Sequence, residues 1–254
     1  MDRLTLTPED TRRTALVAGL LYLATFVFGI PSWFLMHPVL TEPTWILGTG
    51  DDTRVIAGAM FDLVTALAGI GTAVALFSVV KRQHEGLALG FVTSRIYEGA
   101  VIMIGVVSIL AVVTLRQEAA GADSETLVVA GQSLVAVRNV TALLGPGLAP
   151  VLNAVLLGTL LYRSGLVPRA LPALGLVSAP ILLISTLGIA FGVNDPQSAW
   201  TGLATVPVFT WELVLGLYLT FKGFRRTAAL FAGSTPDPRT ISAPAQLISE
   251  AGAA

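Results

Sequence analysis

The sequence predicts an all-α membrane protein, a bundle of six transmembrane helices joined by short loops, with both termini in the cytoplasm. Composition is the first observation behind this prediction. The 254-residue chain is 54% hydrophobic and only 12% charged, with a mean hydropathy of +0.78, whereas soluble domains carry about 25% charged residues. The second observation is that the apolar residues form long separate runs. The third is that Lys and Arg gather on alternate sides of these runs.

Six apolar runs are long enough to cross a hydrocarbon layer of about 30 Å at about 1.5 Å per helical residue. They cover residues 15–34, 55–80, 88–114, 142–162, 170–192 and 203–221. The first run exceeds the core of a signal peptide, about 7–15 residues, and no small-x-small cleavage site follows it, so we expect a retained span. The runs predict one membrane domain over residues 1–226. Residues 227–254, rich in Ala, Ser, Thr and Pro, are expected to form a disordered cytoplasmic tail.

The loops on the two sides of the predicted membrane differ in charge. One side carries most of the basic residues: Arg3, Arg12, Arg13, Lys81, Arg82, Arg163, Arg169, Lys222, Arg225 and Arg226. The other side carries mostly acids: Glu42, Asp51, Asp52, Glu118, Asp123, Glu125 and Asp195. Because short loops rich in Lys and Arg stay in the cytoplasm, this pattern predicts that both termini are cytoplasmic. Trp33, Trp45 and Trp200 are then expected at the outer interface, where indole rings prefer to lie.

The segment before the fourth span has a mixed pattern. Residues 123–139 place apolar side chains between Gln132, Arg138 and Asn139, which predicts an amphipathic helix that is interfacial or partly inserted. The sequence Gly145-Pro146-Gly147 then interrupts the helical pattern, because proline removes a backbone donor. Such a break is tolerated in a membrane where neighbouring groups satisfy the freed backbone.

The second span carries a stripe of small and polar residues at helical spacing: Gly58, Asp62, Thr65, Gly69 and Thr72. Small residues allow close helix approach in lipid, and hydroxyl groups can bond across the contact. The stripe is therefore either a packing face or the lining of a cavity.

Several classes of function lack support in the sequence. The chain has no cysteine, and we find no nucleotide-binding glycine loop, zinc-protease motif or hydrolase elbow. His37 and His84 fall in loops on opposite sides of the predicted membrane, which argues against a shared metal site. The formal net charge of −1 gives no basic surface for nucleic acid. We therefore expect no catalytic residues, no cofactor and no metal, and lipid as the main partner; the sequence makes no prediction about oligomeric state.

Ionisable residues inside the spans are the strongest functional signal. They cost about 2.5–3.5 kcal/mol each in hydrocarbon and are rarely idle. Glu212 falls close to the midplane, and Glu98 and Arg95 lie roughly 5 and 10 Å toward the cytoplasm, at 1.5 Å per residue. Arg95 can pair with Glu98 one turn away and can reach Glu212. Asp62 lies roughly 8 Å outward, beyond the main reach of Arg95, and Asn153 is a further candidate for this polar centre.

Two interpretations of these residues stay open. In one, Arg95, Glu98 and Glu212 only fix how helices pack, as in an accessory or assembly subunit. In the other, Glu212, Arg95, Glu98, Asp62 and Asn153 form a site for a small solute or a proton in a transporter-like or permease-like protein. Three acids and one base leave at least one carboxylate without a full partner, and such a group can carry a proton.

The end of the fourth span reads as a helix terminus. Gly165 can adopt the left-handed conformation of a C-cap, Pro168 prevents continuation, and Arg163 complements the negative end of the helix dipole. Arg163 and Arg169 would then face anionic lipid headgroups.

Four stretches resemble a bacterial family of multi-pass membrane proteins, the domain of unknown function 4386. They are Arg95 to Glu98, the run from Leu161 to Arg169, the closing Trp211-Glu212 with Lys222-Gly223-Phe224, and the opening residues 13–23. The resemblance covers roughly residues 12–226. It implies a helical bundle in the bacterial cytoplasmic (inner) membrane, and because the family carries no established activity, it implies no functional residues.

Overall fold

The computed structural model describes residues 8–118 and 121–225. Residues 227–254, predicted as a disordered tail, lie outside this part of the chain. The long helices are α1 (Pro8–Thr41), α2 (Asp52–Val80), α3 (Glu85–Gln117), α4 (Ser124–Ala142), α5 (Ala149–Ser164), α6 (Ala170–Ala190) and α7 (Ala199–Phe221). Two short elements join them, the 3₁₀ turn η1 (Trp45–Leu47) and the π-helical turn η2 (Leu143–Leu148).

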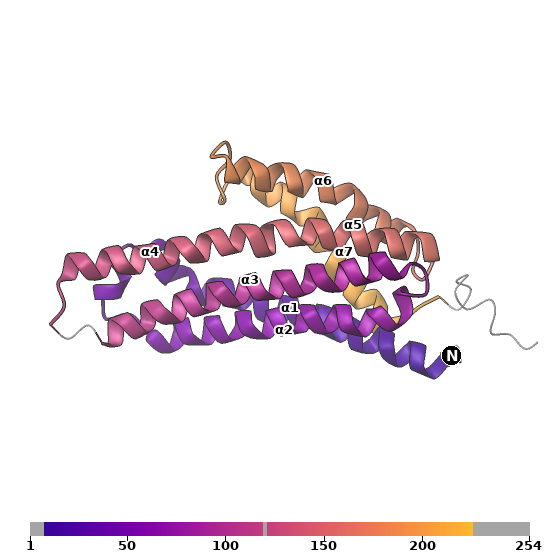
Figure 1. Ribbon diagram of the computed structural model, residues 1–254, viewed down its shortest axis with the longest axis horizontal. Helices are drawn as coiled ribbons and strands as arrows, with labels where there is room; N and C mark the ends of the chain where they lie inside the picture. The colour runs from indigo at the N-terminus through magenta and orange to yellow at the C-terminus, as the bar shows by residue number, and fades with distance from the viewer. Residues whose placement is uncertain (1–7, 119–120, 226–254) are drawn as a thin grey trace, which may run out of the picture.

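The predicted all-α fold is confirmed. The described residues form six helices that are long and apolar enough to cross a membrane, with α4, η2 and α5 counted as one helix of 41 residues. Successive spans run antiparallel (Figure 1). Side by side, α1, α2, α3, α5, α6 and α7 close a ring in that order, because α7 packs back against α1. We call the end that holds the start of α1 and the end of α7 the terminal end, and the other the opposite end.

The amphipathic helix before the fourth membrane helix is present and continues directly into it. Figure 1 shows α4, η2 and α5 as one long rod. The Gly145-Pro146-Gly147 interruption is taken up by the π turn, so the chain does not break there. Side chains satisfy carbonyl groups that the irregular turn leaves free: Thr186 of α6 donates to Gly147 O (3.1 Å) and Tyr97 of α3 donates to Leu144 O (3.4 Å).

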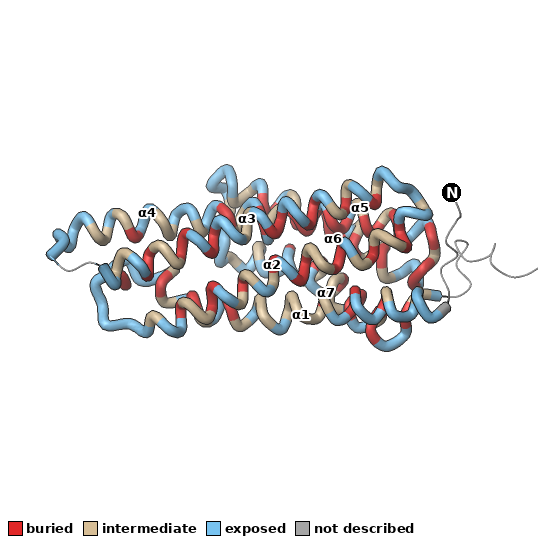
Figure 2. The backbone as a smooth tube through the Cα atoms, turned by 60° about the horizontal axis from the view of Figure 1, so that its bottom comes forward, coloured by how far each residue is buried: buried red, intermediate tan, exposed pale blue. Residues whose placement is uncertain are grey.

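The helices differ in length, and this divides the bundle into two parts. α6 and α7 have 21 and 23 residues, which at 1.5 Å per residue is about 32–35 Å, close to the hydrocarbon thickness. α1 and α3 have 34 and 33 residues and, with α4, extend past α6 and α7 at the opposite end (Figure 1). Buried positions concentrate where the helices of the ring run side by side, whereas α4 is exposed or half-buried along most of its length (Figure 2).

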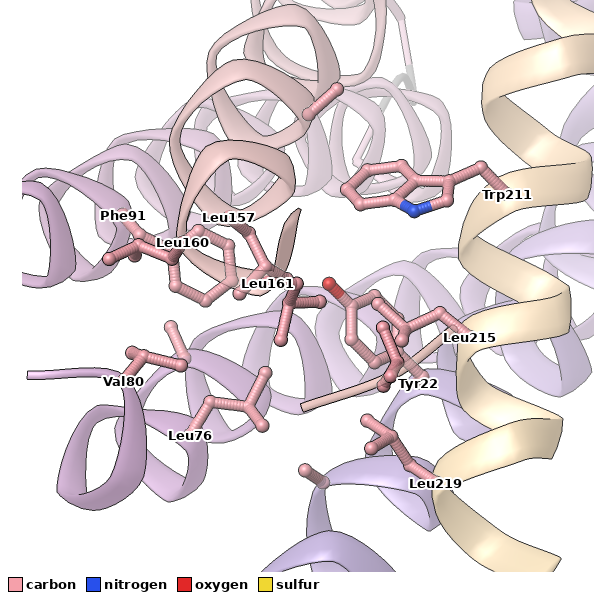
Figure 3. Packing of buried hydrophobic residues seen from close by; sticks show 14 of the residues in the cluster. Tyr22, Leu76, Val80, Phe91, Leu157, Leu160, Leu161, Trp211, Leu215 and Leu219 are labelled. Carbon is pink, nitrogen blue, oxygen red and sulfur yellow. The ribbon is translucent and has the colours of Figure 1, made fainter. Parts of the chain in front are cut away.

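The terminal half holds the larger apolar core (Figure 3). Trp211 and Leu215 of α7 pack there with Tyr22 of α1 and leucines of α5. Gly175 of α6 fits against the Trp211 indole so closely that a Cβ at this position would lie 2.5 Å from the ring. Large interlocked side chains therefore hold the first and last helices of the ring, α1 and α7, together at this level.

The opposite half has a second core, formed by α1, α2, α3 and η1 and covered by α4. Trp45 belongs to this core and is only 4% exposed, so its indole packs inside the protein and does not face lipid. Its ring lies under the guanidinium of Arg116, 4.4 Å away, and Arg116 Nη1 pairs with Asp52 Oδ1 at 2.9 Å. The paired cation explains why this indole is covered. Trp33 and Trp200 are about half exposed.

The helix end predicted after the fourth span is confirmed. α5 ends at Ser164, and Gly165 adopts φ = 64°, in the left-handed region, while its backbone N–H donates to Leu161 O. Glycine reaches this conformation without the Cβ clash that other residues would suffer.

Candidate functional site

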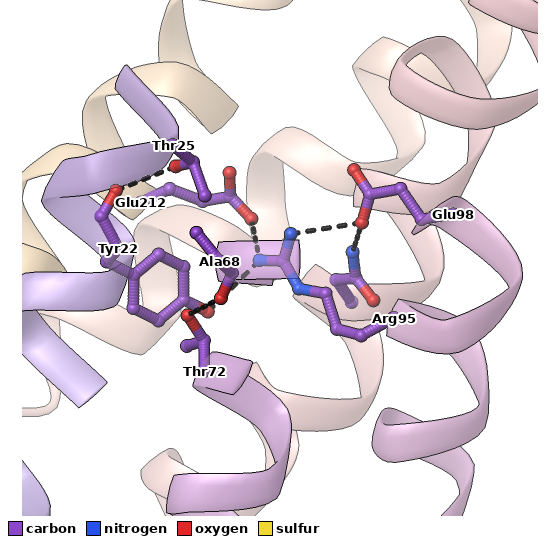
Figure 4. Close-up of polar contacts among 8 residues, drawn as sticks. Tyr22, Thr25, Ala68, Thr72, Arg95, Glu98 and Glu212 are labelled. Carbon is purple, nitrogen blue, oxygen red and sulfur yellow. Dashed lines mark hydrogen bonds and ion pairs between the residues drawn. The ribbon is translucent and has the colours of Figure 1, made fainter. Parts of the chain in front are cut away.

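Arg95 joins three helices at the centre of the ring (Figure 4). Its Nη1 donates to Glu98 Oε2 on its own helix at 3.0 Å, and its Nη2 donates to Glu212 Oε1 of α7 at 2.5 Å. The Arg95 side chain is 4% exposed. The predicted pairing of Arg95 with Glu98 and Glu212 is therefore present, and we call these residues with Tyr22 and Asn153 the central cluster.

Tyr22 is the member of the cluster that sequence reasoning missed. Arg95 Nη2 also donates to the Tyr22 hydroxyl at 3.2 Å, and the guanidinium lies 5.3 Å from the Tyr22 ring centre and 5.8 Å from that of Phe91. A tyrosine in an apolar run is normally interpreted as a packing residue. The sequence does not show how α1 is rotated about its axis, and this rotation decides where the hydroxyl points. Tyr22 thus ties α1 to the α3–α7 ion pair.

Asn153 of α5, predicted as a further candidate, is fully buried and donates from Nδ2 to Glu98 Oε2 at 2.8 Å. Glu98 Oε2 thereby accepts two hydrogen bonds. Within the described residues no donor contacts Glu98 Oε1 or Glu212 Oε2, and neither oxygen is fully buried. One guanidinium therefore serves two carboxylates, and each carboxylate keeps one free oxygen.

A cavity of about 520 Å³ ends on this cluster, with Arg95, Glu98 and Glu212 in its lining. The walls are mostly apolar and come from every helix of the ring; besides the cluster they comprise Thr25, Phe26, Gly29, Ile30, Trp33, Phe34, Thr65, Ala66, Gly69, Gly99, Ile102, Pro146, Pro150, Leu182, Thr205, Val208 and Phe209. The side chains of Ile30, Trp33 and Phe34 on α1 are 44–58% exposed, and Thr205 of α7 is exposed as well. The cavity therefore reaches the surface in the opposite half, where these α1 and α7 residues lie.

The small and polar stripe of α2 serves both of the roles left open by the sequence. Gly58 packs against Met36 and Leu35 of α1, where a Cβ would lie 2.7 Å from Met36 Cγ. Thr65 and Gly69, further along the stripe, line the cavity. The same face of α2 thus changes from packing contact to cavity wall toward the central cluster.

Asp62 lies outside the cavity and belongs to a separate buried pair. Its Oδ2 accepts from Arg138 Nη2 at 2.8 Å, and its Oδ1 accepts from Ser32 Oγ at 2.6 Å. Arg138 reaches Asp62 because α4 packs along α3 beside Gly105, which has no side chain in the way of Arg138. The π turn keeps α4 in line with α5, so that α4 can lie along α3. The structure therefore brings Arg95, Glu98, Glu212 and Asn153 together and leaves Asp62 apart from them.

The two arginines for which the sequence predicts lipid headgroup contacts lie at the terminal end. Arg163 and Arg169 are exposed there, and the Arg169 guanidinium lies 5.8 Å from the Tyr162 ring centre. In the described part of the chain no group of three or more His, Asp or Glu side chains is arranged to hold a metal ion.

No curated protein and no solved structure matches the chain. The model of the family called domain of unknown function 4386 matches residues 17–223, a range that includes every member of the central cluster. The chain therefore belongs to the family of the domain of unknown function 4386.

Proposed function

We propose that this multi-pass membrane protein is permease-like and binds a small solute or a proton at the central cluster. One observation carries the proposal: an open cavity ends on two carboxylates that share a single guanidinium. Glu212 lies two residues from the middle of α7 (Ala199–Phe221), about 3 Å along the axis. The site is therefore near the middle of the layer that α6 and α7 can span, where transporters commonly bind their substrates.

The chemistry of the cluster suits a proton. If both carboxylates are ionised, Arg95 neutralises one of them and the other is left without a counter-charge in apolar surroundings. A proton or a bound cation removes this excess charge, and each can replace the other. A group that exchanges its counter-charge through an open cavity is a carrier site in physical terms.

The proposed location is the bacterial cytoplasmic (inner) membrane with both termini in the cytoplasm. Support comes from the terminal end, where Arg12, Lys81, Arg163, Arg169 and Lys222 lie at helix ends. Cationic ends of this kind stay on the cytoplasmic side and contact anionic headgroups. We propose such headgroup contacts for Arg163 and Arg169.

Proton flux into liposomes that contain the purified protein and a pH-sensitive dye tests the proposal. Under an imposed pH gradient, we expect flux in the wild type and in Glu118→Gln, an exposed carboxylate at the opposite end, and loss of flux in Glu212→Gln. A wild type with no flux of protons, alone or with added solutes, and no ligand that raises its unfolding temperature would instead favour an accessory or assembly subunit whose buried charges only specify packing.

A further inference from the structure

The unpaired polar atoms that the central cluster presents to the cavity are carboxylate oxygens. Glu98 Oε1 and Glu212 Oε2 have no donor among the described residues, and both side chains line the cavity. The other titratable groups around Glu212 are Arg95 and Glu98 of α3 and Tyr22 of α1. α6, which also packs on α7, carries no titratable side chain. A ligand that reaches the cluster therefore meets carboxylate oxygens in excess of positive charge.

The positive charge of the cluster is already in use. Arg95 Nη1 is bonded to Glu98, and Nη2 is bonded to both Glu212 and Tyr22. Its Nε is buried without a partner and out of contact with the cavity space. An anion would have to displace a carboxylate from Arg95 and would face the second carboxylate at close range, which is strongly unfavourable at low dielectric. The geometry thus selects against anionic ligands.

The walls offer little to a neutral polar ligand. The lining hydroxyl groups of Thr25, Thr65 and Thr205 each donate to a carbonyl of their own helix, at 2.7, 2.9 and 2.8 Å. A sugar or amide could donate to the free carboxylate oxygens of the cluster, but the walls offer few partners to its other polar groups, and each unsatisfied polar group is costly in such surroundings.

Aromatic rings form much of the remaining wall. Phe26, Trp33 and Phe34 of α1 and Phe209 of α7 line the cavity, and Phe26 packs edge-on against Phe209 with ring centres 4.6 Å apart. Ring faces attract cations, and apolar walls accept hydrocarbon groups. The exposed lining residues of the mouth, Trp33 and Phe34, lie on the surface of a helix that crosses the membrane. A ligand dissolved in the adjoining lipid leaflet can therefore enter there.

We propose that the ligand of this cavity is a monovalent organic cation with an apolar or aromatic body, which enters from the membrane and competes with a proton for the central cluster. The inference rests on the proposed function and names its substrate class. When the cation binds, the proton held by the excess carboxyl group passes to water, so the charge of the site is conserved. Glu212 and Glu98 hold the cationic centre, and the aromatic wall holds the body.

Isothermal titration with two ions of matched shape and opposite sign, tetraphenylphosphonium and tetraphenylborate, tests this inference on the purified full-length protein in detergent. We expect tetraphenylphosphonium to bind the wild type and Glu118→Gln alike. We expect Glu212→Gln to bind at least about 30-fold more weakly, as for the loss of one partner from a buried charge pair. Tetraphenylborate is expected not to bind in a Glu212-dependent way.

The wild type alone supplies a second readout, should Glu212→Gln fail to fold. Titration in buffers of different ionisation enthalpy is expected to show proton release on cation binding. As pH falls and the carboxyl group becomes protonated, the affinity for tetraphenylphosphonium is expected to weaken by up to about tenfold per pH unit. Equal binding of both ions, or cation binding without proton release and unchanged in Glu212→Gln, would overturn the proposed substrate class. A neutral or anionic compound whose binding depends on Glu212 would overturn it too, while leaving the permease-like function intact.

Discussion

Two buried ionic groups of this bundle each pair an arginine with carboxylates, but they differ in stoichiometry and in access. Arg138 meets one carboxylate, Asp62, whose second oxygen is taken by Ser32. Arg95 is shared by Glu98 and Glu212, each with one oxygen left over. The first group lies outside the cavity, and the second forms its end. A buried charge in a membrane helix is thus a poor guide to function until its partners are counted.

The surroundings sharpen the difference. On the terminal side, the central cluster rests on a closely packed core around Trp211 and Tyr22. Toward the opposite end it opens into the cavity, whereas the Asp62–Arg138 pair is covered by α4. We infer that the first group is an exchangeable site and the second a fixed helix contact.

The largest expected effect is that of Arg95→Met. Removal of the Arg95 guanidinium leaves Glu98 and Glu212 without the cation that pairs with them, and breaking such a buried group costs about 3–5 kcal/mol of unfolding free energy. Unfolding in mixed SDS micelles measures this loss, with the exposed Arg163→Met as control. A loss below about 1 kcal/mol would show that the cluster does not hold α3 against α7.

A similar loss, about 3 kcal/mol, is expected for Asp62→Asn, because Arg138 then stays buried without its carboxylate. The double variant Asp62→Leu with Arg138→Met is expected to recover to within about 1 kcal/mol of the wild type, since an apolar pair can replace a structural ion pair. Proton flux in liposomes should stay intact in this double variant. Loss of flux there would place Asp62 in the site and erase the contrast between the two groups.

The packing beneath the central cluster is tested by a smaller change. Gly175→Ala drives a Cβ to 2.5 Å from the Trp211 ring, and overpacking of this kind costs about 1–3 kcal/mol. Gly202→Ala is the matched control: it lies in α7 with no atom within 4 Å of the added Cβ, and we expect it to stabilise by about 0.5–1 kcal/mol. Equal effects of the two substitutions in the same unfolding assay would show that the bundle is packed no more tightly around Trp211 than around Gly202.

The smallest expected effect concerns the start of α4, the helix that carries Arg138. Asp123 caps this helix, and the backbone N–H and hydroxyl of Thr126 lower the pKa of its carboxyl group. The carboxylate thus supports the helix start at pH values above its unfolded pKa, about 3.9, and the support is lost as pH falls through the lower folded pKa. Hydrogen exchange at Thr126 and Leu127, corrected for its intrinsic pH dependence, should rise at low pH in the wild type. In Asp123→Ala it should be raised at every pH, and unchanged exchange there would mean that the cap contributes nothing.

Most of the central cluster could be predicted from the sequence, because the features that indicate it lie within single helices. Charges are rare in apolar runs, Arg95 and Glu98 share a helix face, and axial position places Glu212 within reach. Asn153 followed from the same axial estimate. These arguments need only the length of each span and the rise per residue.

The contacts that could not be predicted from the sequence depend on how each helix is rotated about its axis and on whether a helix continues through a proline. Tyr22 joins the cluster only because α1 turns its hydroxyl inward, and Trp45 is buried because Arg116 folds over it. The Asp62–Arg138 contact needed a straight path through Gly145-Pro146-Gly147, and the π turn provides it. A proline in the sequence signals a helix defect, but not whether that defect ends the helix or only widens one turn.

The most direct test of the contrast is chemical labelling of the buried carboxyl groups with dicyclohexylcarbodiimide, an apolar reagent that modifies accessible protonated carboxyls, followed by mass spectrometry. We expect modification at Glu212 or Glu98, protection of that residue when tetraphenylphosphonium is present, and no modification of Asp62. Labelling of Asp62 at a rate equal to or above that of Glu212 and Glu98 would contradict the account, because it would show that the cavity does not set these carboxylates apart.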